Sequence, residues 1–322
     1  MSDAVAAVIV TFNGAAWIER CLSSLFDGSL APRVYVVDNA SSDDSAAIVE
    51  ARFPQAVLIR SARNLGFGVG NNLGIARALA DGAQYVLLLN QDAHVLPDTV
   101  AGLLLFMQAE PAVGVVSPLH CGPDESTIDR KTYVGYLANG ARDLLCDAVL
   151  GRPQPHYLIC GINAAAWFMR AAVLRKVGGF DPLFFMYGED DDLIARLAWH
   201  GVGFALLPSQ RIVHLRQSPP RPPPSGWWDD VARRAARAES QLLVRVKHPE
   251  HSQRHRVLLL VAHGVIGPLA DLLIERDLRE YAGSLRASWR VLRKLPMVGR
   301  HARLGAAEGP HFLPLPPSEC AA

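Results

Sequence analysis

The chain has 322 residues, of which half are hydrophobic and a fifth are charged, so it is long enough for one large or two ordinary domains and is not a disordered or fibrous chain. Its 32 Lys and Arg residues nearly balance its 31 Asp and Glu residues, which argues against a nucleic-acid-binding protein. The charge is unevenly distributed, because residues 1–210 carry 14 basic and 21 acidic side chains, whereas residues 211–303 carry 18 basic and 8 acidic ones. We therefore expect two electrostatically different parts.

The first half of the chain alternates short β-rich apolar runs with helical patterns, which is typical of a mostly parallel sheet flanked by helices. The predicted strands are residues 4–11, 34–38, 56–59, 85–90, 113–117 and 204–207. The predicted helices are residues 15–26, 43–52, 69–81, 98–109, 171–177 and 191–200. Periodicity weakens over residues 119–158, which we interpret as an insertion. The N-terminus lacks the basic region and the long apolar run of a signal peptide.

The organisation of the chain follows from these patterns. We expect one α/β domain over residues 1–217, made of two parts of about 1–118 and about 119–217. SPPRPPPSG (218–226) is a Pro-rich linker, residues 227–303 form a basic helical extension, and residues 304–322 form a loose tail. Within the extension, the apolar residues 258–274 include His263 and Pro268. They predict a helix pair that packs on the domain or lies at a membrane surface.

Polar residues follow the predicted strands where ligands bind in open α/β sheets. The first strand ends at Thr11 and Asn13, the second at Asp38 and Asn39, and the fourth at Asn90, Gln91 and Asp92. Helix capping alone explains neighbours such as Ser42 and Asp43. Capping does not explain Asp38 and Asp92, and two acids at one edge of a sheet instead indicate a contact with a ribose or base and a site for a divalent cation.

A glycine-rich turn follows the third predicted strand. It reads RNLGFGVGNNLG from Arg63, and it includes Asn64, Gly66, Gly70 and Asn71. Such a turn at a helix start presents free N–H groups to phosphate. Together with Arg63, it favours a diphosphate contact over a mere tight turn.

Four consecutive carboxylates, Glu189 to Asp192, stand where a helix begins. The helix dipole favours one or two acids in a first turn, but four repel one another and raise at least one pKa, as a general base requires. Asp192 is placed to pair with Arg196 four residues later. A lone histidine such as His214, which ends an apolar stretch, is more often structural than a ligand.

These segments in this order, VIVTFNG, VVDNASSDDS, NLGFGVGNNLG, LLLNQDAHV, GGFDPLFFMYGEDDDLIARL and His214, resemble family 2 glycosyltransferases of the GT-A fold, in particular the bacterial rhamnosyltransferase-like branch. The resemblance covers residues 4–216, and it implies that residues 1–217 are a GT-A glycosyltransferase domain with a donor half (about 1–118) and an acceptor half (about 119–217). It implies an inverting transfer of a sugar, with rhamnose as one candidate, from a dTDP or UDP sugar to a hydroxyl of a glycan or lipid-linked acceptor.

The resemblance also implies roles for individual residues. Those that match donor-binding positions are Thr11, Asn13, Asp38, Asn39, Arg63, Asn64, Gly66, Gly70, Asn71, Asn90 and Asp92. Asp92 and His214 match ligands of Mg²⁺ or Mn²⁺, although Asn90 stands where the family carries the first Asp of its DxD motif. Glu189 and Asp190 match the catalytic pair, with Asp190 as the base. Residues 119–158 and 161–167 then frame the acceptor pocket, where Trp167, Phe185 and Tyr187 are candidates to stack on a sugar ring.

Two other interpretations remain open at the level of sequence. A sugar-nucleotide pyrophosphorylase needs a basic Gly-rich loop after the first strand, which this chain lacks, and a non-catalytic sugar-nucleotide or glycan-binding relative has no need of a base. The surplus of basic residues in the extension has two equally supported interpretations: the residues bind anionic lipid head groups, or they form a solvated helical face. It includes Arg233, Arg234, Arg237, Arg245 and Lys247. We expect a cytoplasmic protein, peripheral on the inner membrane if the first alternative holds; the sequence carries no signal for oligomeric state.

Overall fold

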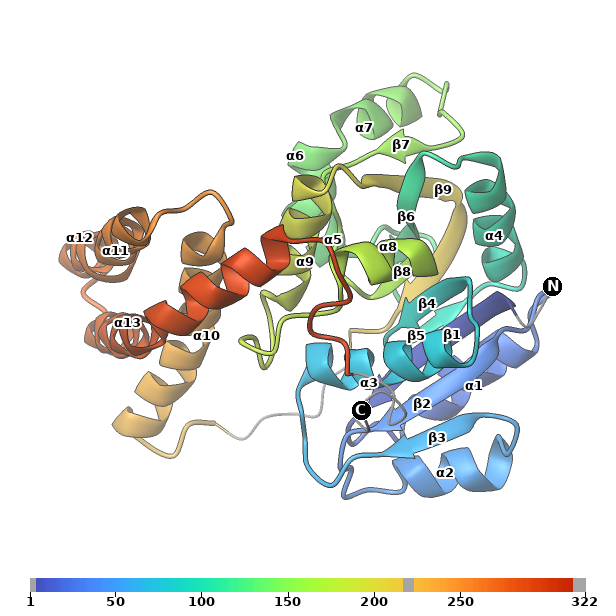
Figure 1. Ribbon diagram of the computed structural model, residues 1–322, viewed down its shortest axis with the longest axis horizontal. Coiled ribbons are helices and arrows are strands. Elements are labelled where there is room, and N and C mark those ends of the chain that lie inside the picture. Colours follow the sequence, from blue (N-terminus) through green and yellow to red (C-terminus); the bar gives the residue numbers. More distant parts are fainter. Residues whose placement is uncertain (1–3, 217–222, 315–322) are drawn as a thin grey trace.

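The computed structural model describes residues 4–216 and 223–314, and their centre is a sheet of nine strands (Figure 1). The strands are β1 (Val5–Thr11), β2 (Arg33–Asp38), β3 (Val57–Arg60), β4 (Tyr85–Leu89), β5 (Ala93–Val95), β6 (Val113–Cys121), β7 (Tyr157–Leu158), β8 (Ala166–Arg170) and β9 (Gly203–His214). They lie in the order β3-β2-β1-β4-β8-β6-β9-β5, and β7 also pairs with β9. The α/β fold class is confirmed.

The sheet has a parallel half and a mixed half. Strands β1 to β4 pair in parallel, as expected from strands separated by helices. Strand β8 runs antiparallel to both β4 and β6, whereas β6 and β9 are parallel. Strands β5 and β8 were not predicted, and β9 is twelve residues long rather than four. Strand β5 has only three residues, too few to show a period, and β8 is apolar on both faces because both are buried.

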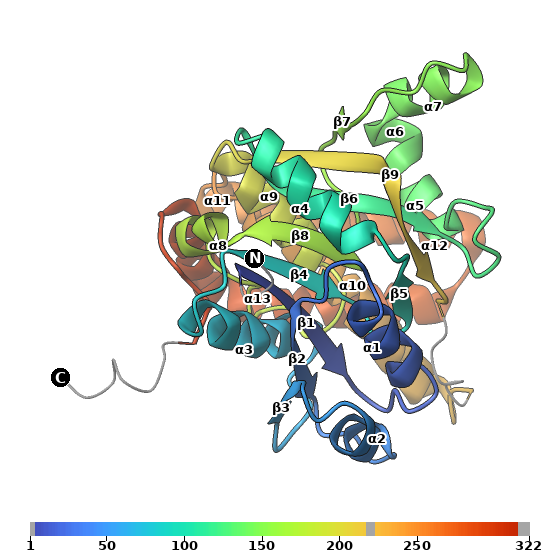
Figure 2. The ribbon, with the colours of Figure 1, turned by 90° about the vertical axis from the view of Figure 1, so that its right-hand side faces the viewer.

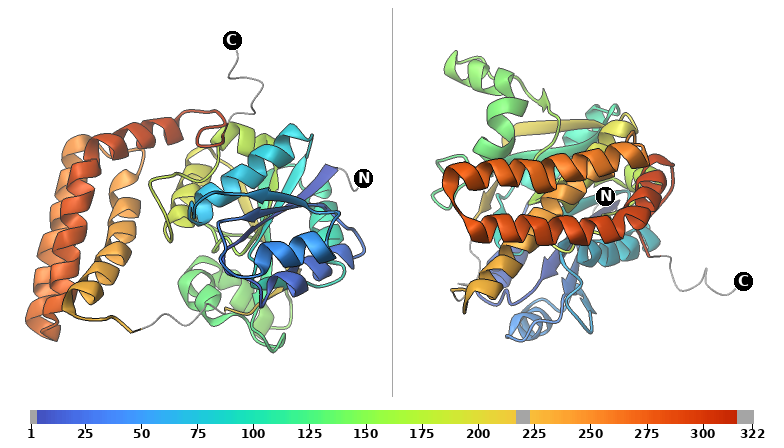
Figure 3. Two further views of the ribbon diagram at one scale, coloured as in Figure 1. Left: turned by 90° about the horizontal axis from the view of Figure 1, so that it is seen from below. Right: turned by 90° about the vertical axis from the view of Figure 1, so that its left-hand side faces the viewer.

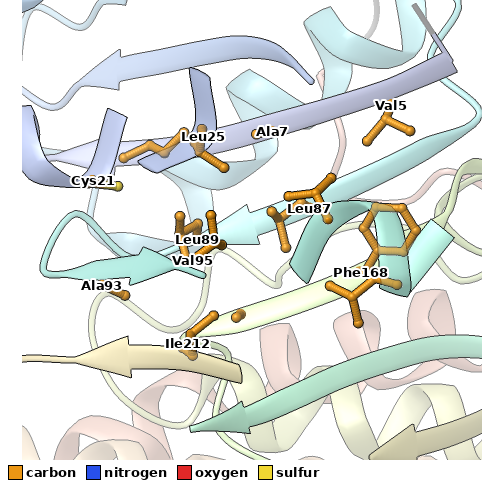
Figure 4. Close-up of a cluster of buried hydrophobic side chains, with 14 of the residues drawn as sticks. Val5, Ala7, Cys21, Leu25, Leu87, Leu89, Ala93, Val95, Phe168 and Ile212 are labelled. Carbon is orange, nitrogen blue, oxygen red and sulfur yellow. The ribbon is translucent and has the colours of Figure 1, made fainter. Parts of the chain in front are cut away.

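Helices cover both faces of the sheet (Figure 2). On one face, α1 (Ile18–Phe26), α2 (Ser45–Arg52) and α4 (Thr99–Ala109) pack on alternate strand residues. Figure 4 shows part of this cluster, with Leu25 of α1 and the strand residues Val5 and Ala7. On the other, α3 (Phe67–Ala80), α8 (Ala171–Val177) and α9 (Glu189–Trp199) pack on the residues between them. This division follows from the two-residue period of a strand, which points successive side chains to opposite faces.

The insertion over residues 119–158 folds onto the same face as α9. Its elements are α5 (Arg130–Thr132), the π-helix η2 (Tyr133–Leu137), α6 (Ala138–Gly140), α7 (Arg142–Val149) and β7. Leu137 and Leu144 are buried in the core of that face. The insertion is therefore placed beside the start of α9, where the four carboxylates lie.

The extension is a layer of long helices beside the domain (Figure 3). It consists of α10 (Trp227–Lys247), α11 (Gln253–Val261), the π-helix η3 (Ala262–Ile266), α12 (Gly267–Glu275) and α13 (Leu278–Ala306). The predicted helix pair is one continuous helical stretch, Gln253–Glu275, that is long and apolar enough to cross a membrane by length and composition alone. Pro268 does not break it, because the Gly264 carbonyl, four residues earlier, accepts the Ser288 hydroxyl at 2.8 Å.

Of the predicted loose tail, the structure describes residues 304–314, which are held against the domain, so the expectation is wrong for these residues. The Gly309 amide donates to the Lys176 carbonyl at 2.7 Å, and the Gly179 amide donates to the His311 carbonyl at 2.9 Å. The Asn72 side chain donates to the Phe312 carbonyl. Composition suggested a loose segment, but backbone hydrogen bonds to the domain hold it in place. Most of the predicted linker, residues 218–222, lies outside the described residues.

Candidate active site

The fold brings Asn90, Asp92 and His214 together from distant parts of the chain. Strand β5 pairs with the end of β9 so that Ala93 faces His214, and the Leu215 amide donates to the Asp92 carbonyl at 2.9 Å. His214 Nε2 lies 3.4 Å from Asp92 Oδ1 and 3.4 Å from Asn90 Nδ2. The predicted metal ligands are therefore neighbours at the carboxyl end of β4.

These residues fit one side of a cation's coordination shell. The part of the chain that the structure describes holds no cluster of three His, Cys, Asp or Glu residues able to bind a metal by themselves. Asp92 and His214 would supply two ligands, and Asn90 Oδ1 is buried without a hydrogen-bond partner among the described residues. Mg²⁺ and Mn²⁺ accept such carboxylate and amide oxygens and complete their shells with substrate oxygens and water.

A buried polar network behind His214 escaped the sequence analysis. The His120 and His214 rings meet edge-on, with their centroids 6.4 Å apart. Burial, together with the charge of His214, lowers the pKa of His120 to about 3. Arg216 forms an ion pair with the buried Asp129 at 2.6 Å. Residue types with ordinary spacing gave no signal for this network, because it joins β6, the insertion and the end of β9. It fixes the backbone on which His214 stands.

At the ends of β1 and β2, the predicted nucleoside-binding residues also lie together. The Thr11 hydroxyl is buried and donates to Gln91 Oε1 at 2.7 Å. Asn13 has a positive φ of 49°, and its Oδ1 accepts the Ser42 amide at 2.8 Å. Asp38 is buried at the end of β2. Gln91 connects this group to the turn that carries Asn90 and Asp92.

The asparagines of the predicted phosphate-binding turn shape the turn itself. Asn39 accepts the Leu65 amide at 2.8 Å and donates to Asn64 Oδ1 and the Gly66 carbonyl at 3.0 Å. Asn71 is buried and donates to a carbonyl within α3. Asn39 and Asn71 were predicted to contact the donor; the Asn39 side chain and the Asn71 Nδ2 group have hydrogen-bond partners inside the protein. Arg63 lies exposed beside the turn.

The glycines of this turn allow close packing. A Cβ on Gly66, whose φ is +81°, would lie 2.0 Å from the Phe185 carbonyl oxygen, and one on Gly70 would lie 2.9 Å from Val10. The Phe67 amide donates to the same Phe185 carbonyl at 3.2 Å. The expectation of free N–H groups is therefore wrong at residues 65–67, because their amides already have acceptors within the protein.

Helix α9 begins at Glu189, two residues before the predicted start, and places Asp190 beside the strand ends. Asp190 is half-buried and accepts the Ala164 amide, while the adjacent Ala165 carbonyl accepts the Asn90 amide. Burial and the charge of Asp191 raise the Asp190 pKa to about 6. Burial and the charge of Asp190 raise the Glu189 pKa to about 8. At neutral pH Asp190 is thus ionised and Glu189 largely protonated.

The other two carboxylates of the cluster have separate partners. Asp191 is exposed and accepts the Tyr136 hydroxyl of the insertion at 3.4 Å. Asp192 is buried and pairs with Arg196 at 3.0 Å, as predicted, and also with Lys247 of α10. Asp192 is therefore structural, whereas Asp190 remains at the surface of the site.

The aromatic candidates divide between the core and the surface. Trp167 is fully buried between Phe180 and Phe204 and cannot stack on a sugar, so that prediction is wrong. Phe185 and Tyr187 are 59% and 62% exposed on the loop before α9. Both remain available to a ligand.

Comparison with known proteins gives consistent findings. The sequence matches the model of the family described as Glycosyl transferase family 2 over residues 6–178. It is 29% identical over 239 residues to an N-acetylglucosaminyl-diphospho-decaprenol L-rhamnosyltransferase of Mycobacterium tuberculosis, covering 66% of this chain and 76% of that protein. It is 28% identical over 221 residues to the galactofuranosyltransferase GlfT1 of the same organism, covering 66% and 71%.

Solved structures share the fold at low sequence identity. S. aureus TarS in complex with UDP has a TM-score of 0.53 at 15% identity, covering 94% of this chain and 87% of that one. The mannosyltransferase PcManGT from Pyrobaculum calidifontis, in complex with GDP-Man and Mn²⁺, has a TM-score of 0.53 at 17% identity, covering 94% and 85%. The family match spans more than half of the chain and these solved structures share its fold, so this protein belongs to glycosyl transferase family 2, has the GT-A fold and is a glycosyltransferase.

Proposed function

We propose that this glycosyltransferase moves a sugar, with inversion at the anomeric carbon, from a nucleoside-diphosphate sugar to a hydroxyl of a glycan or lipid-linked acceptor. The observation that carries the proposal is Asp190, a half-buried carboxylate with a pKa near 6, connected through residues 164 and 165 to the Asn90–Asp92 turn. A general base works best with a pKa close to the working pH. Burial and Asp191 bring Asp190 into that range.

The chemical step assigns one role to Asp190. Its carboxylate accepts the proton of the acceptor hydroxyl while that oxygen bonds to the anomeric carbon. The bond to the nucleoside diphosphate breaks on the opposite face of the sugar, and the diphosphate leaves with the bonding electrons. Because there is one displacement, the configuration inverts. Glu189, protonated at neutral pH, holds a proton on its buried carboxyl beside the base and so limits the negative charge there.

Donor binding uses the carboxyl ends of β1, β2 and β4. Asp38 and Asn13 would contact the nucleoside, and the exposed Arg63 would approach the diphosphate. Thr11, which is fully buried, would act indirectly by holding Gln91. Asn39, Asn64 and Asn71 would act indirectly by holding the turn that carries Arg63. The rhamnosyl and galactofuranosyl relatives support a dTDP-type or UDP-type donor, with rhamnose as one candidate sugar.

Asp92, His214 and Asn90 would hold Mg²⁺ or Mn²⁺ at this site. The bound cation would supply neutralisation of the charge that develops on the leaving diphosphate. The support is the 3.4 Å separation of Asp92 and His214 and the unpartnered Asn90 oxygen. The structures of GalNAc-T7 and PcManGT, which share the fold and contain Mn²⁺, add to it.

The acceptor would enter between the insertion and the loop before α9. Tyr136, Phe185 and Tyr187 border this approach and could contact a sugar ring or the lipid-proximal part of the acceptor. The name of the mycobacterial rhamnosyltransferase specifies a diphospho-decaprenol acceptor, which supports a lipid-linked acceptor at the cytoplasmic face of the membrane for this chain too.

A donor and acceptor screen tests the proposal. The purified chain is incubated with UDP and dTDP sugars, Mn²⁺ or Mg²⁺, and polyprenyl-diphosphate-linked N-acetylglucosamine, and nucleoside diphosphate release is measured together with product mass. We expect release that requires acceptor and metal and a product heavier by one sugar. Release without any glycosylated product, or no difference between samples with and without EDTA, would contradict the proposed reaction or its metal dependence respectively.

A further inference from the structure

The basic residues that the sequence places near lipid are mostly engaged within the protein. Lys247 has a side chain only 3% exposed and pairs with two buried aspartates. Arg234 forms ion pairs with three carboxylates, and Arg233 pairs with Asp229 at 2.9 Å. The interpretation of these residues as lipid-binding cations is therefore wrong for Lys247 and Arg234.

The side of the extension turned away from the catalytic domain is apolar and uncovered. The stretch Gln253–Glu275 has a mean hydropathy of 2.2 over its most apolar window, yet only 11% of that window is buried. It lies side by side with α13, as both views in Figure 3 show and the Ser288–Gly264 hydrogen bond requires. We call the exposed apolar residues of these two helical segments the outer face. It includes Leu258, Ile266, Leu273, Ile274, Trp289 and Leu292, each 44–80% exposed.

Unpaired cations border this outer face. Arg286, Arg293 and Arg300 stand seven residues apart on α13, so they line one side of the helix next to Leu285 and Leu292. All three are exposed. Within residues 4–216 and 223–314 they form no ion pair, unlike Arg290, which pairs with Glu239 at 3.2 Å. An apolar face with a row of free arginines and an exposed tryptophan matches a membrane interface that carries anionic lipids.

We propose that the outer face lies in the surface of an anionic membrane, with the axes of both helical segments parallel to the membrane plane. Insertion of Gln253–Glu275 as a spanning helix is disfavoured, because α13 packs along it. Spanning would draw Arg290 and Lys294, and the row of free arginines, into the hydrocarbon, where charged side chains are costly. In the surface orientation the arginines meet lipid head groups and the apolar residues reach the acyl boundary.

The outer face is continuous with the transfer site through the rest of the extension. The buried residues Leu260, Val291 and Leu295 pack in one core with α10 and with Phe184, which precedes the loop that carries Phe185 and Tyr187. Membrane docking would therefore fix the distance of the acceptor entrance from the lipid surface. The docking proposal deepens the proposed function and rests on it, because a membrane-bound enzyme is useful only if the acceptor is lipid-linked. The residues of the docking surface are different from those of the transfer site.

Vesicle co-sedimentation of the full chain tests the docking surface. The vesicles contain phosphatidylcholine alone or with phosphatidylglycerol. One variant, L273E/I274E/W289E, places charges on the outer face, and another, R286Q/R293Q/R300Q, removes the row of arginines. The matched controls are L105E, which alters a 66% exposed leucine on α4, and R33Q/R52Q/R60Q, which removes three exposed arginines of the catalytic domain.

We expect the wild type and both controls to sediment with the anionic vesicles. The arginine variant should lose on the order of a hundredfold in partitioning to them, and the apolar variant should remain in the supernatant. Binding of UDP with Mn²⁺ in calorimetry without vesicles should be the same in all variants, which separates this proposal from the proposed reaction. Wild type that stays in solution overturns the proposal, as does a dimer that only L273E/I274E/W289E dissociates. Protein that resists alkaline carbonate extraction would show a spanning helix and overturn the surface orientation.

Discussion

Replacing Lys247 with methionine should destabilise the protein strongly, because its ammonium group neutralises two buried carboxylates. Lys247 Nζ lies 2.8 Å from Asp181 Oδ2 and also contacts Asp192, and the three side chains are at most 6% exposed. Although burial alone would raise it, the Asp181 pKa is held below its usual value by His301 and Lys247. Methionine is an unbranched apolar side chain one heavy atom shorter than lysine, so it keeps most of the stem and removes the charge.

The magnitude follows from the partners that remain. Removing one member of a buried ion pair costs about 3–5 kcal/mol, since the other charge is left uncompensated. His301 still binds Asp181 at 2.7 Å and Arg196 still binds Asp192 at 3.0 Å, so we expect the lower end, about 3 kcal/mol.

Urea unfolding followed by circular dichroism measures this loss. The control is K294M, which removes a lysine that pairs with Glu239 but is 39% exposed, and it should cost less than about 1 kcal/mol. If K247M and K294M unfold at the same urea concentration, the buried cluster does not join the extension to α9 in the way described.

Other variants test the base, the metal site and the packing of α3. The rate of transfer should fall as the pH drops below about 6, where Asp190 becomes protonated, and D191N should shift this limb to lower pH because the Asp191 charge helps raise the Asp190 pKa; an unmoved limb in D191N would show that another group titrates. H214A should weaken Mn²⁺ binding by at least about tenfold in calorimetry without donor, and unchanged affinity would remove His214 from the metal site. G74A should lower the free energy of unfolding by about 1–3 kcal/mol, because its Cβ would lie 2.3 Å from Val8. The control is G135A, whose Cβ would meet nothing within 4 Å, so this variant should unfold like the wild type. Equal stability of the two variants would mean that α3 can move away from β1.

The parallel half of the sheet and the polar strand ends were predictable because their signals are local. An apolar run of seven residues predicts strand β1. A similar apolar run predicts β2, and it stops at Asp38. The start of α9 was visible to within two residues, since the helix dipole favours acids in a first turn and four acids stand there. These features depend on residues within a few positions of one another.

The features that could not be predicted from the sequence depend on contacts between distant segments of the chain. Strand β5 exists because three residues pair with β9, more than a hundred residues later, and this pairing is what brings Asp92 to His214. The partners of Asn39 and Asn71, and the Lys247–Asp192 contact, likewise cannot be inferred from residue type. Pro268 suggested a break between two helices. The Ser288 hydroxyl that donates to the Gly264 carbonyl comes from another helix, so this contact could not be inferred from the local sequence.

The most direct test of the account is the activity of D190N measured together with its donor affinity. Asparagine has nearly the same shape but cannot accept the acceptor proton, so we expect transfer to be abolished while donor binding stays within a few-fold of wild type. D191N is the matched control, since it removes the neighbouring exposed carboxylate and should keep transfer at neutral pH. Normal turnover by D190N would contradict the assignment of Asp190 as the base and, with it, the proposed mechanism.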